Sequence, residues 1–497
     1  MAVSKITLNF ARIFPLLDIR TALRRNDMKR ILAIFSVIML AAGCLAAVQH
    51  HAPRVKYPGK KCYTYRITLK DKHGGAYAID KPRQFLSAKA IERRKRQNLK
   101  IDSTDLPVSR SYIRSIMATN DEMTLVGTSK WNNTVLINCI DTSIVNSIKR
   151  LSFVNSCQLV WVSPDSITPG IKRKKLKDSF NAWDSLKHVK YGSAHEQIAL
   201  LNGQKLHEKG FRGEGMSIAV LDGGFANVDR LNAFSNVKIG GHEDFVFPRS
   251  RSIFNETDHG TKVLSAMGVN APTVYIGTAP EATFWLLRCE DQQSEQPVEE
   301  DYWAMAAEYA DSVGVDLISS SLGYNEYDNH LGDHKYSEMD GMTTLISRTA
   351  SMLAGKGIIL VNSAGNYGMG TWKKITFPAD AHDIITVGAV TPTLVNAPFS
   401  GIGPTQDGRI KPDLMATGSP AALISARGTV MEDMGTSFST PIICGLIACL
   451  WQAMPQKTAL EMIDIVRRCG NNYNTPDNIY GYGIPDFMNC LEVRGEK

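Results

Sequence analysis

The stretch Ile218-Ala219-Val220-Leu221-Asp222-Gly223-Gly224 decides the fold. Its first four residues form a continuous apolar run, which is typical of a strand that is buried on both faces. The strand ends in an acid that is followed by two flexible glycines. Ligands of open α/β sheets bind outside the carboxyl ends of the strands, so Asp222 lies where function is expected. Taken alone, it also fits a turn-forming aspartate.

Similar short apolar runs recur along the chain after residue 189. They lie at residues 217–221, 282–287, 315–319, 358–361 and 384–387. Helical stretches at 302–313 and 342–354 stand between them. Strands that alternate with helices predict a doubly wound α/β domain, in which a mostly parallel sheet is covered by helices on both faces. We assign residues 189–497 to this domain.

A second, smaller domain is predicted at residues 60–163, where strands and helices are mixed over about a hundred residues. The strands are expected at 63–69, 134–139 and 157–162, and the helices at 85–96 and 144–151. This pattern indicates a small α+β domain. Residues 164–188 contain two prolines and a basic run and have little periodicity, so we expect an exposed linker there.

The N-terminal residues 1–47 have the features of a secretory signal. Met28-Lys29-Arg30 precedes an apolar run at 31–42 that is shorter than the roughly 20 residues of a membrane span. We expect translation to begin at Met28, and the alternative is a signal with a long n-region. The exit before Cys44 resembles a bacterial lipoprotein cleavage box, and ordinary cleavage near Ala46 or Ala47 is the alternative. We therefore expect a secreted, periplasmic or outer-envelope protein that meets a membrane only through a lipid on Cys44.

Charge and cysteine usage exclude some functions. The net charge is +7, and much of the excess lies in short basic runs without a nucleic-acid reading motif, so we expect no nucleic-acid partner. The nine cysteines include no Cys-x-x-Cys pair and predict no metal site. Cys444 and Cys449 fit small core residues of an apolar helix. Cys469 and Cys490 could form a disulfide, which the sequence leaves open.

Two further motifs carry candidate side chains near the ends of predicted elements. His259 stands in Asp258-His259-Gly260-Thr261, at the start of an apolar helical stretch. Asn366 stands in Ser363-Ala364-Gly365-Asn366-Tyr367-Gly368, which follows the strand at 358–361. Each motif alone has a structural explanation, a helix-start histidine or a turn asparagine.

The last motif is Gly435-Thr436-Ser437-Phe438-Ser439-Thr440-Pro441, directly before an apolar helix. Pro441 suits the first turn of a helix. Ser437 therefore lies at a helix N-terminus, where free N–H groups and the helix dipole favour a developing negative charge. The structural alternative is a helix-capping serine.

Together, the four motifs resemble the subtilisin family of serine proteases over about residues 189 to 490. The family's signatures occur in order, and they include Ser321-Leu322-Gly323 between the histidine and asparagine motifs. Three positions depart from the family pattern. Gly223 follows the acid where serine or threonine is common, Lys262 follows His-Gly-Thr, and Phe438 follows the serine. The first of these could weaken the support of Asp222.

The resemblance implies a serine endopeptidase that cleaves polypeptides by acyl transfer. Asp222, His259 and Ser437 would form the catalytic triad, and Asn366 would stabilise the oxyanion. The cleft would be lined by Ser321, Leu322, Gly323, Ala364 and Gly365, whose main chains would pair with an extended peptide. The chemistry needs no cofactor. The resemblance allows structural calcium, although no loop has EF-hand spacing.

The resemblance also bears on residues 60–163, which fit a self-removed propeptide that acts as intramolecular chaperone and inhibitor. The alternative is an accessory binding domain that is kept after maturation. Two rival functions are alternatives for the whole chain. A non-catalytic subtilisin fold that serves as a binding or envelope-structural protein is opposed by the intact triad. An α/β-hydrolase esterase is excluded, because Ser437 lacks a Gly-x-Ser-x-Gly elbow and no histidine follows it.

Overall fold

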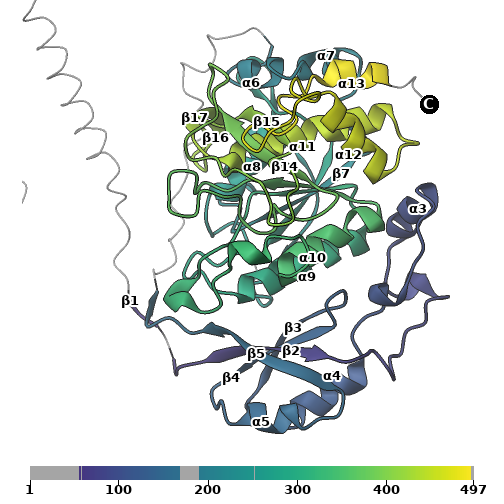
Figure 1. Cartoon of the computed structure of the whole chain (residues 1–497), viewed down its shortest axis with the longest axis vertical. Coiled ribbons are helices and arrows are strands. Elements are labelled where there is room, and N and C mark those ends of the chain that lie inside the picture. Colours follow the sequence, from purple (N-terminus) through teal and green to yellow (C-terminus); the bar gives the residue numbers. More distant parts are fainter. Residues whose placement is uncertain (1–54, 58, 168–189, 251, 494–497) are drawn as a thin grey trace, which may run out of the picture. The chain divides into compact units, whose positions relative to one another are not determined.

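A computed structural model describes residues 55–57, 59–167, 190–250 and 252–493. The chain divides into two units, Met1–Val55 and Lys56–Lys497, and the second contains nearly all of the described residues. The predicted signal segment and most of the predicted linker lie outside the described residues. The description below concerns the second unit (Figure 1).

A seven-stranded sheet forms the centre of the C-terminal region. Its strand order is β15-β14-β13-β12-β7-β11-β8, and every neighbouring pair is parallel. The bounds are β7 Ser217–Asp222, β8 Lys238–Asp244, β11 Thr283–Arg288, β12 Leu317–Ser320, β13 Ile359–Ser363, β14 Ile385–Val390 and β15 Leu414–Thr417. Because all strands point the same way, their carboxyl ends lie at one edge of the sheet.

Helices cover both faces of this sheet. Along β7, Ile218 and Val220 pack into the core that includes α8 (His259–Gly268) and α11 (Thr436–Ala453). Ala219 and Leu221, which alternate with them, pack toward α9 (Val298–Val313) and α10 (Leu345–Met352). This alternation, with all four side chains buried, follows from the two-residue period of a strand. The predicted doubly wound α/β class is confirmed.

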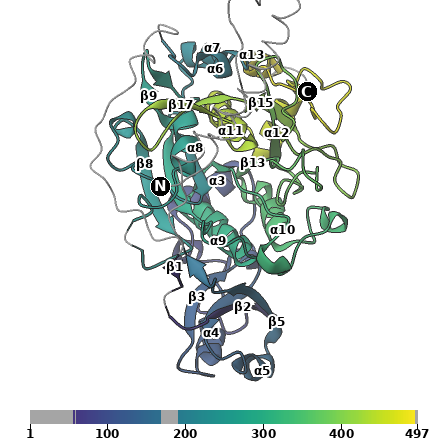
Figure 2. The same ribbon diagram turned by 90° about the vertical axis from the view of Figure 1, so that its left-hand side faces the viewer.

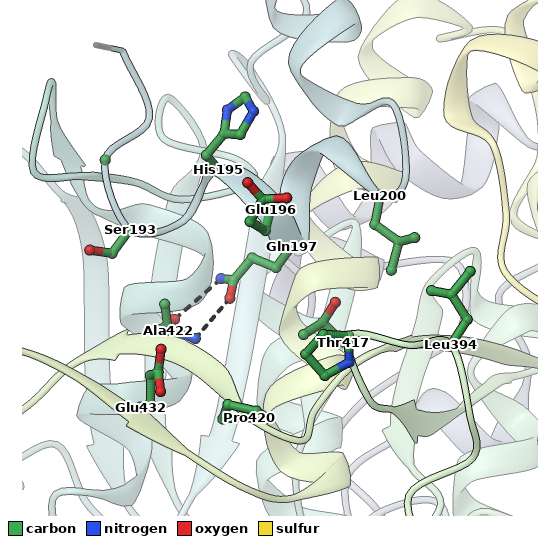
Figure 3. A pocket seen from close by; sticks show the side chains of 12 residues that line it. Ser193, His195, Glu196, Gln197, Leu200, Leu394, Thr417, Pro420, Ala422 and Glu432 are labelled. Carbon is green, nitrogen blue, oxygen red and sulfur yellow. Dashed lines mark hydrogen bonds between the residues drawn. The ribbon is translucent and has the colours of Figure 1, made fainter. Parts of the chain in front are cut away.

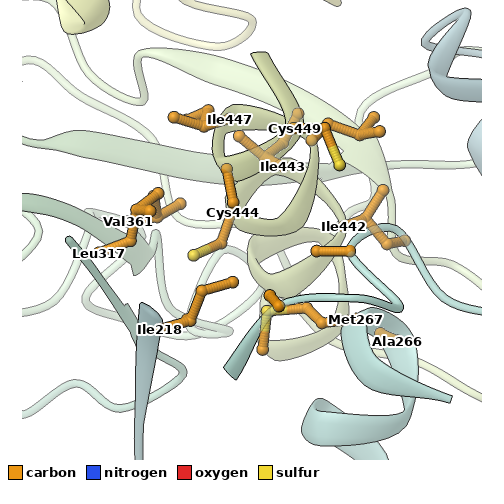
Figure 4. Packing of buried hydrophobic residues seen from close by; sticks show 14 of the residues in the cluster. Ile218, Ala266, Met267, Leu317, Val361, Ile442, Ile443, Cys444, Ile447 and Cys449 are labelled. Atoms are coloured by element: carbon orange, nitrogen blue, oxygen red, sulfur yellow. The ribbon is translucent and has the colours of Figure 1, made fainter. Parts of the chain in front are cut away.

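Helix α11 lies in the middle of the first of these cores (Figure 4). Both of its cysteines, Cys444 and Cys449, are fully buried, as the sequence predicted. Among the described residues, this is the one helix long and apolar enough to cross a membrane, yet 89% of it is buried inside the protein. Its apolar character therefore reflects its place in the core.

The N-terminal region contains an antiparallel sheet of order β3-β4-β2-β5. Its elements are β2 Tyr63–Leu69, α3 Ala88–Arg96, α4 Arg110–Met117, β3 Thr124–Ser129, β4 Thr134–Cys139, α5 Ile144–Lys149 and β5 Val154–Val162. Residues of α4 and α5 share a core with one face of the sheet. On the other face, Leu136 and Val160 share a core with residues of α9 and α10 (Figure 1 and Figure 2). The predicted small α+β region is confirmed.

Some predicted elements differ from those observed. The chain of the peptidase region begins with two short helices, α6 (His195–Ala199) and α7 (Gly203–Glu208), which were not predicted as separate elements from the sequence. Asn202 between them has a left-handed backbone, with φ of 54°, which ends the first helix. The helix expected at 85–96 begins only at Ala88, because the Ser87 side chain accepts a hydrogen bond from Ala90 N–H and caps it.

Several short elements complete the described chain. They are β1 Val55–Lys56, β6 Ser166–Ile167, β9 Asn270–Ala271, β10 Tyr275–Ile276, β16 Ala421–Ile424, β17 Val430–Asp433, α12 Ala459–Arg468 and α13 Phe487–Glu492. Cys469 and Cys490, whose pairing the sequence left open, are buried free thiols in the structure.

Candidate active site

The candidate residues gather at the carboxyl edge of the large sheet. Asp222 is the last residue of β7, Ser321 follows β12 directly, and Asn366 stands three residues beyond the end of β13. These strands are neighbours in the order β13-β12-β7. Parallel strands thus bring together residues that are 45 to 144 positions apart in sequence.

Asp222 and His259 form a direct pair. The His259 Nδ1 atom lies 2.9 Å from Oδ2 and 3.0 Å from Oδ1 of Asp222, whose side chain is fully buried. His259 is the first residue of α8, which approaches the end of β7 closely. Gly260 makes this approach possible, since a Cβ there would lie 2.4 Å from the Gly224 carbonyl oxygen. The buried carboxylate therefore fixes the orientation of the imidazole.

Ser437 is the second residue of α11 and is 8% exposed. Its hydroxyl lies 3.4 Å from the Ser321 carbonyl oxygen, and the Ser321 hydroxyl donates to the Ser437 carbonyl at 2.8 Å. The ring of Phe438 lies 5.7 Å from the His259 ring, centroid to centroid. No hydrogen bond within the described part of the chain joins the Ser437 hydroxyl to His259. Such bonds are often long in the absence of substrate.

Asn366 is held by the residue before the serine. Its Oδ1 atom accepts hydrogen bonds from the main-chain N–H of Thr436, at 2.9 Å, and from the Thr436 hydroxyl, at 3.0 Å. Because both donors contact the oxygen, the amide orientation is determined, and the Nδ2 group faces away from Thr436. The Asn366 side chain is exposed, so this N–H donor is available to a ligand.

The five predicted cleft-lining residues divide into two groups. Ala364 donates to Val387 and accepts from Thr376, while Gly365 donates to the Thr436 hydroxyl and accepts from Gly401. These main-chain groups are already bonded, so the expected pairing of residues 364–365 with a peptide is wrong in this detail. The neighbouring segment Ser321, Leu322 and Gly323 is partly free. The Ser321 carbonyl accepts from Ser437 and the Leu322 carbonyl from Asn362, whereas the main-chain groups of Gly323 have no hydrogen-bond partner among the described residues.

The loop after Asp222 has its own support, despite the glycine at position 223. The Gly223 N–H donates to Asp222 Oδ1 at 2.8 Å. Its carbonyl accepts from the Arg288 guanidinium at 3.0 Å, and buried Arg288 also pairs with Asp244 at 3.1 Å. The other departure, Lys262, pairs with Asp433 of β17 at 3.1 Å. The Gly223 main chain thus provides a hydrogen bond where a side-chain hydroxyl would be expected.

Electrostatics at the site favour a protonated imidazole. Burial acts against the charged form of His259, but the charge and hydrogen bond of Asp222, together with the charge of Glu290, outweigh it and raise the pKa of His259 to about 9. Burial and the nearby charge of Asp222 raise the pKa of Glu290 to about 7. Glu290 is thus a third titratable group beside this pair.

A pocket of about 410 Å³ lies elsewhere, where α6 meets the β16–β17 hairpin (Figure 3). Gln197 donates to the Ala422 carbonyl at 3.2 Å and accepts from its N–H at 2.9 Å. None of the candidate residues lines this pocket. Its contacts instead anchor the first described residues after the linker to the body of the domain.

Three residues at the site were not singled out from the sequence. Thr436 orients Asn366, Arg288 supports the loop after Asp222, and Glu290 stands beside the Asp222–His259 pair. Thr436 lies inside a quoted motif. Glu290 follows a predicted strand, and because ligands bind outside the carboxyl ends of such strands, the sequence offered a signal for Glu290. Among the described residues, no three or more His, Cys, Asp or Glu side chains gather in a way that could hold a metal ion.

A doubly wound sheet with an acid, an imidazole and a helix-start serine at its carboxyl edge is the arrangement of a serine peptidase. The chain belongs to the subtilase family, because residues 213–483 match the family described as Peptidase S8, Subtilase family. Residues 64–178 match the Peptidase S8 propeptide domain, Bacteroidota. The protein is a subtilisin-like serine endopeptidase with a propeptide domain, and its chemistry needs no cofactor.

Curated relatives agree with this assignment. The chain is 27% identical to the serine protease AprX of Bacillus subtilis over 332 residues, which cover 60% of this chain and 70% of that protein. It is 26% identical to subtilisin NAT of Bacillus subtilis subsp. natto over 284 residues, 56% of this chain and 67% of the relative. Subtilisin of Bacillus pumilus is 26% identical over 290 residues, 58% of this chain and 94% of the relative.

Proposed function

We propose that this chain is a secreted or envelope serine endopeptidase, made as a zymogen that processes itself. Asp222, His259 and Ser437 form its catalytic triad, and Asn366 is its oxyanion donor. The peptide cleft is lined by Ser321, Leu322, Gly323, Ala364 and Gly365, and of these the Ser321–Gly323 segment pairs with the substrate main chain. The observation that carries the proposal is the 2.9 Å contact between Asp222 and His259 at the sheet edge where Ser437 begins α11.

The mechanism follows from this geometry. His259 Nε2 takes the proton of the Ser437 hydroxyl as Oγ attacks the scissile carbonyl carbon. Asp222 holds Nδ1 protonated and stabilises the imidazolium. The carbonyl oxygen becomes an oxyanion, which accepts from Asn366 Nδ2 and from the Ser437 N–H. His259 then protonates the leaving amine, and water, activated by the same imidazole, releases the acyl group from Ser437.

A fluorophosphonate probe tests the triad directly. We expect it to label Ser437 in the processed protein, because only a serine activated by a neighbouring base reacts rapidly with such a probe. Peptide mapping of the labelled protein identifies the site. A processed, folded protein that takes up no label would instead favour a non-catalytic binding function.

Activity should rise with pH in the alkaline range. The general base must be neutral, and the pKa of His259 is raised from its usual 6.5 to about 9 by Asp222 and Glu290 against the effect of burial. Below this pKa the neutral fraction falls about tenfold per pH unit. We therefore expect kcat/KM for a neutral peptide to increase from pH 6 to pH 9. An acid limb at or below pH 6.5 would contradict this.

The proposed zymogen has three parts after the signal segment at 1–47: a prodomain at 60–163, a processing region at 164–188 and the peptidase at 189–497. The end of the prodomain contacts a loop of the peptidase that leaves the catalytic edge. Gln296 accepts from the Val162 N–H at 2.7 Å and donates to the Val162 carbonyl at 2.9 Å. This contact supports a linker that begins beside the cleft and is cut by the chain's own active site.

A second contact region, around α3, supports the prodomain's role as chaperone and inhibitor. Arg93 donates to the Asp311 carboxylate and to the Val315 carbonyl, both at 2.5 Å, and to the Lys356 carbonyl at 3.1 Å. Gln97 accepts from the Ala459 N–H at 2.8 Å, at the start of α12. Asp311, Val315 and Lys356 precede β12 and β13, at the opposite end of these strands from Ser437. Helix α3 thus holds together the ends of several peptidase elements.

We predict that Arg93→Met releases the prodomain after processing. Arg93 is 2% exposed and donates to Asp311, Val315 and Lys356. Arg94 and Lys130 still pair with Asp311 in the variant, so we expect the loss of a charge-assisted hydrogen bond, about 1.5–3 kcal/mol, or at least tenfold in affinity. The measurement is size-exclusion chromatography of the processed protein, with its serine blocked, over a range of dilutions. Lys95→Met is the matched control, because Lys95 is exposed on the same helix. Equal retention of the prodomain in both variants would contradict the prediction.

The proposed location is outside the cytoplasmic membrane, in the secreted, periplasmic or outer-envelope space. The family's propeptide match and its relatives support an exported peptidase, and residues 28–47 have the pattern of a signal. If Cys44 carries the lipid, Cys44→Ala should move the protein from the membrane fraction to the soluble fraction. Full-length protein with its signal, recovered from the cytoplasm of the native host, would contradict export.

A further inference from the structure

Glu290 lies next to the triad acid, but it follows strand β11, whereas Asp222 ends strand β7. Strand β11 pairs with β7 in parallel, with Arg288 opposite Asp222, and the Cys289 N–H donates to the Asp222 carbonyl at 3.0 Å. Glu290 is the next residue along the chain. The carboxyl edge thus presents Asn366, Ser321, Asp222 and Glu290 from four successive strands, β13, β12, β7 and β11.

The carboxylate of Glu290 is not bonded to any described side chain, although the charges of His259 and Arg288 act on it. Neighbouring acids are paired: Asp222 with His259, and Asp244 and Glu256 with Arg288. Glu290 is half-buried, and within the described residues no hydrogen bond or ion pair reaches its carboxylate. A partly desolvated carboxylate without a partner is costly, so such a group is typical of a site completed by a ligand.

The local backbone leaves space for this carboxylate. A Cβ at Gly223 would lie 3.0 Å from Glu290 Oε2 and 3.1 Å from Thr257 Cγ2. These distances are tighter than most real contacts of a Cβ atom. The glycine that departs from the family pattern after the triad acid therefore lies against the Glu290 side chain.

The surroundings of Glu290 are acidic. Glu295 is also half-buried, and the charges of Glu290 and Glu295 both act on Tyr367, the exposed residue that follows Asn366. A second, independent feature is Tyr324, which is 1% exposed and whose hydroxyl has no hydrogen-bond partner in the described part of the chain. The charges that act on this hydroxyl include Glu299, Glu290 and Glu295. Tyr324 and Cys289, the residue before Glu290, belong to the same buried core.

The prodomain contacts the loop that contains Glu290. Val162 is bonded to Gln296 through both of its main-chain groups, and residues 289–297 connect β11 to α9, so the end of the prodomain lies against the loop that contains Glu290. Glu290, at the β11 end of this loop, lies against Gly223, the residue that follows the triad acid. A substrate side chain that reaches Glu290 therefore belongs to a residue close to the scissile bond.

We propose that Glu290 determines specificity by receiving the lysine or arginine side chain of a substrate residue one or two positions before the scissile bond. This inference rests on the proposed peptidase function. A cationic side chain would supply the partner that the carboxylate lacks, at charge-assisted hydrogen-bond distance. The chain's own processing region carries such side chains at Lys172-Arg173-Lys174-Lys175.

The test compares fluorogenic peptides that differ at one position. Each of the four residues before the scissile bond is set in turn to arginine, glutamine or norleucine, and kcat/KM is measured with the processed enzyme. We expect arginine to be preferred about 10- to 100-fold at one of the two positions nearest the bond. In Glu290→Gln this ratio should fall to within about threefold of unity.

Glu243→Gln is the matched control, because it removes the same charge from an exposed position on β8. It should keep the arginine preference of the unmodified enzyme. No preference for arginine at either near position, or a preference that survives in Glu290→Gln, would overturn the inference. These outcomes require an enzyme that cleaves the neutral peptides and takes up the fluorophosphonate; absence of both would refute the proposed function instead.

Discussion

Ser437→Ala is expected to abolish peptidase activity, with turnover about a million-fold lower, a magnitude known from subtilisin itself. The hydroxyl is the only atom group removed, and the remaining pair of Asp222 and His259 has nothing to activate. The residual rate should reflect the oxyanion site and substrate binding alone. The measurement is the steady-state rate on a peptide substrate, together with thermal unfolding to show that the fold is intact.

The matched control for this variant is Ser439→Ala. Ser439 lies two residues further along α11, is fully buried and donates to the Thr436 carbonyl at 3.0 Å. Its loss should cost roughly 1 kcal/mol of stability and leave most of the activity. Near-full activity in purified Ser437→Ala would refute the assignment of the nucleophile.

The same Ser437→Ala variant also reports on processing. If the chain cuts its own linker, the uncut precursor should accumulate in this variant, and its cut position, between about residues 160 and 190, should be missing from the mass spectrum. Addition of a small amount of active enzyme distinguishes cleavage within one molecule from cleavage between molecules. An unchanged cut in Ser437→Ala expressed alone would assign the processing to another protease.

The sequence predicted the large sheet well because its strands are buried on both faces. Continuous apolar runs such as 217–221 and 358–361 have few alternatives to a central parallel strand. Edge strands were harder: β8 consists largely of exposed residues and contains two glycines at 240–241, so it has no apolar pattern to detect. The helix break at Asn202 was equally difficult to predict, because its left-handed backbone ends a helix without any proline or glycine at that position.

The candidate site was predictable in its residues but not in its bonds. Four strand and helix ends were found because each carries a polar side chain beside an apolar run. No sequence pattern reports that the Ala364 and Gly365 main chains are already bonded to Val387, Thr376 and Gly401. Nor does a pattern indicate that a carboxylate such as that of Glu290 forms no hydrogen bond or ion pair with the described residues. Both facts depend on contacts between segments distant in sequence.

Asn366→Ala is expected to lower turnover by about 10²- to 10³-fold with little change in KM, as for the corresponding group in subtilisin. The Nδ2 donor meets the oxygen only when negative charge develops there, so its loss affects the transition state more than substrate binding. The informative partner variant is Asn366→Asp. An aspartate can still accept from the Thr436 N–H, but it replaces the donor by a negative charge.

If Asn366 acts as an oxyanion donor, Asn366→Asp should be at least as inactive as Asn366→Ala, although its local structure is better preserved. If Asn366 only lines the cleft or only anchors Thr436, the aspartate variant should be the more active of the two. Thr436→Val gives an intermediate test, because it removes the hydroxyl that lies 3.0 Å from Asn366 Oδ1 but keeps the N–H at 2.9 Å. Two hydrogen bonds are lost, because the hydroxyl also accepts from the Gly365 N–H at 3.1 Å, and turnover should fall by roughly tenfold to a hundredfold through a less firmly oriented amide. A change in KM without a change in kcat, in any of the three variants, would mean that the side chain binds substrate rather than the transition state.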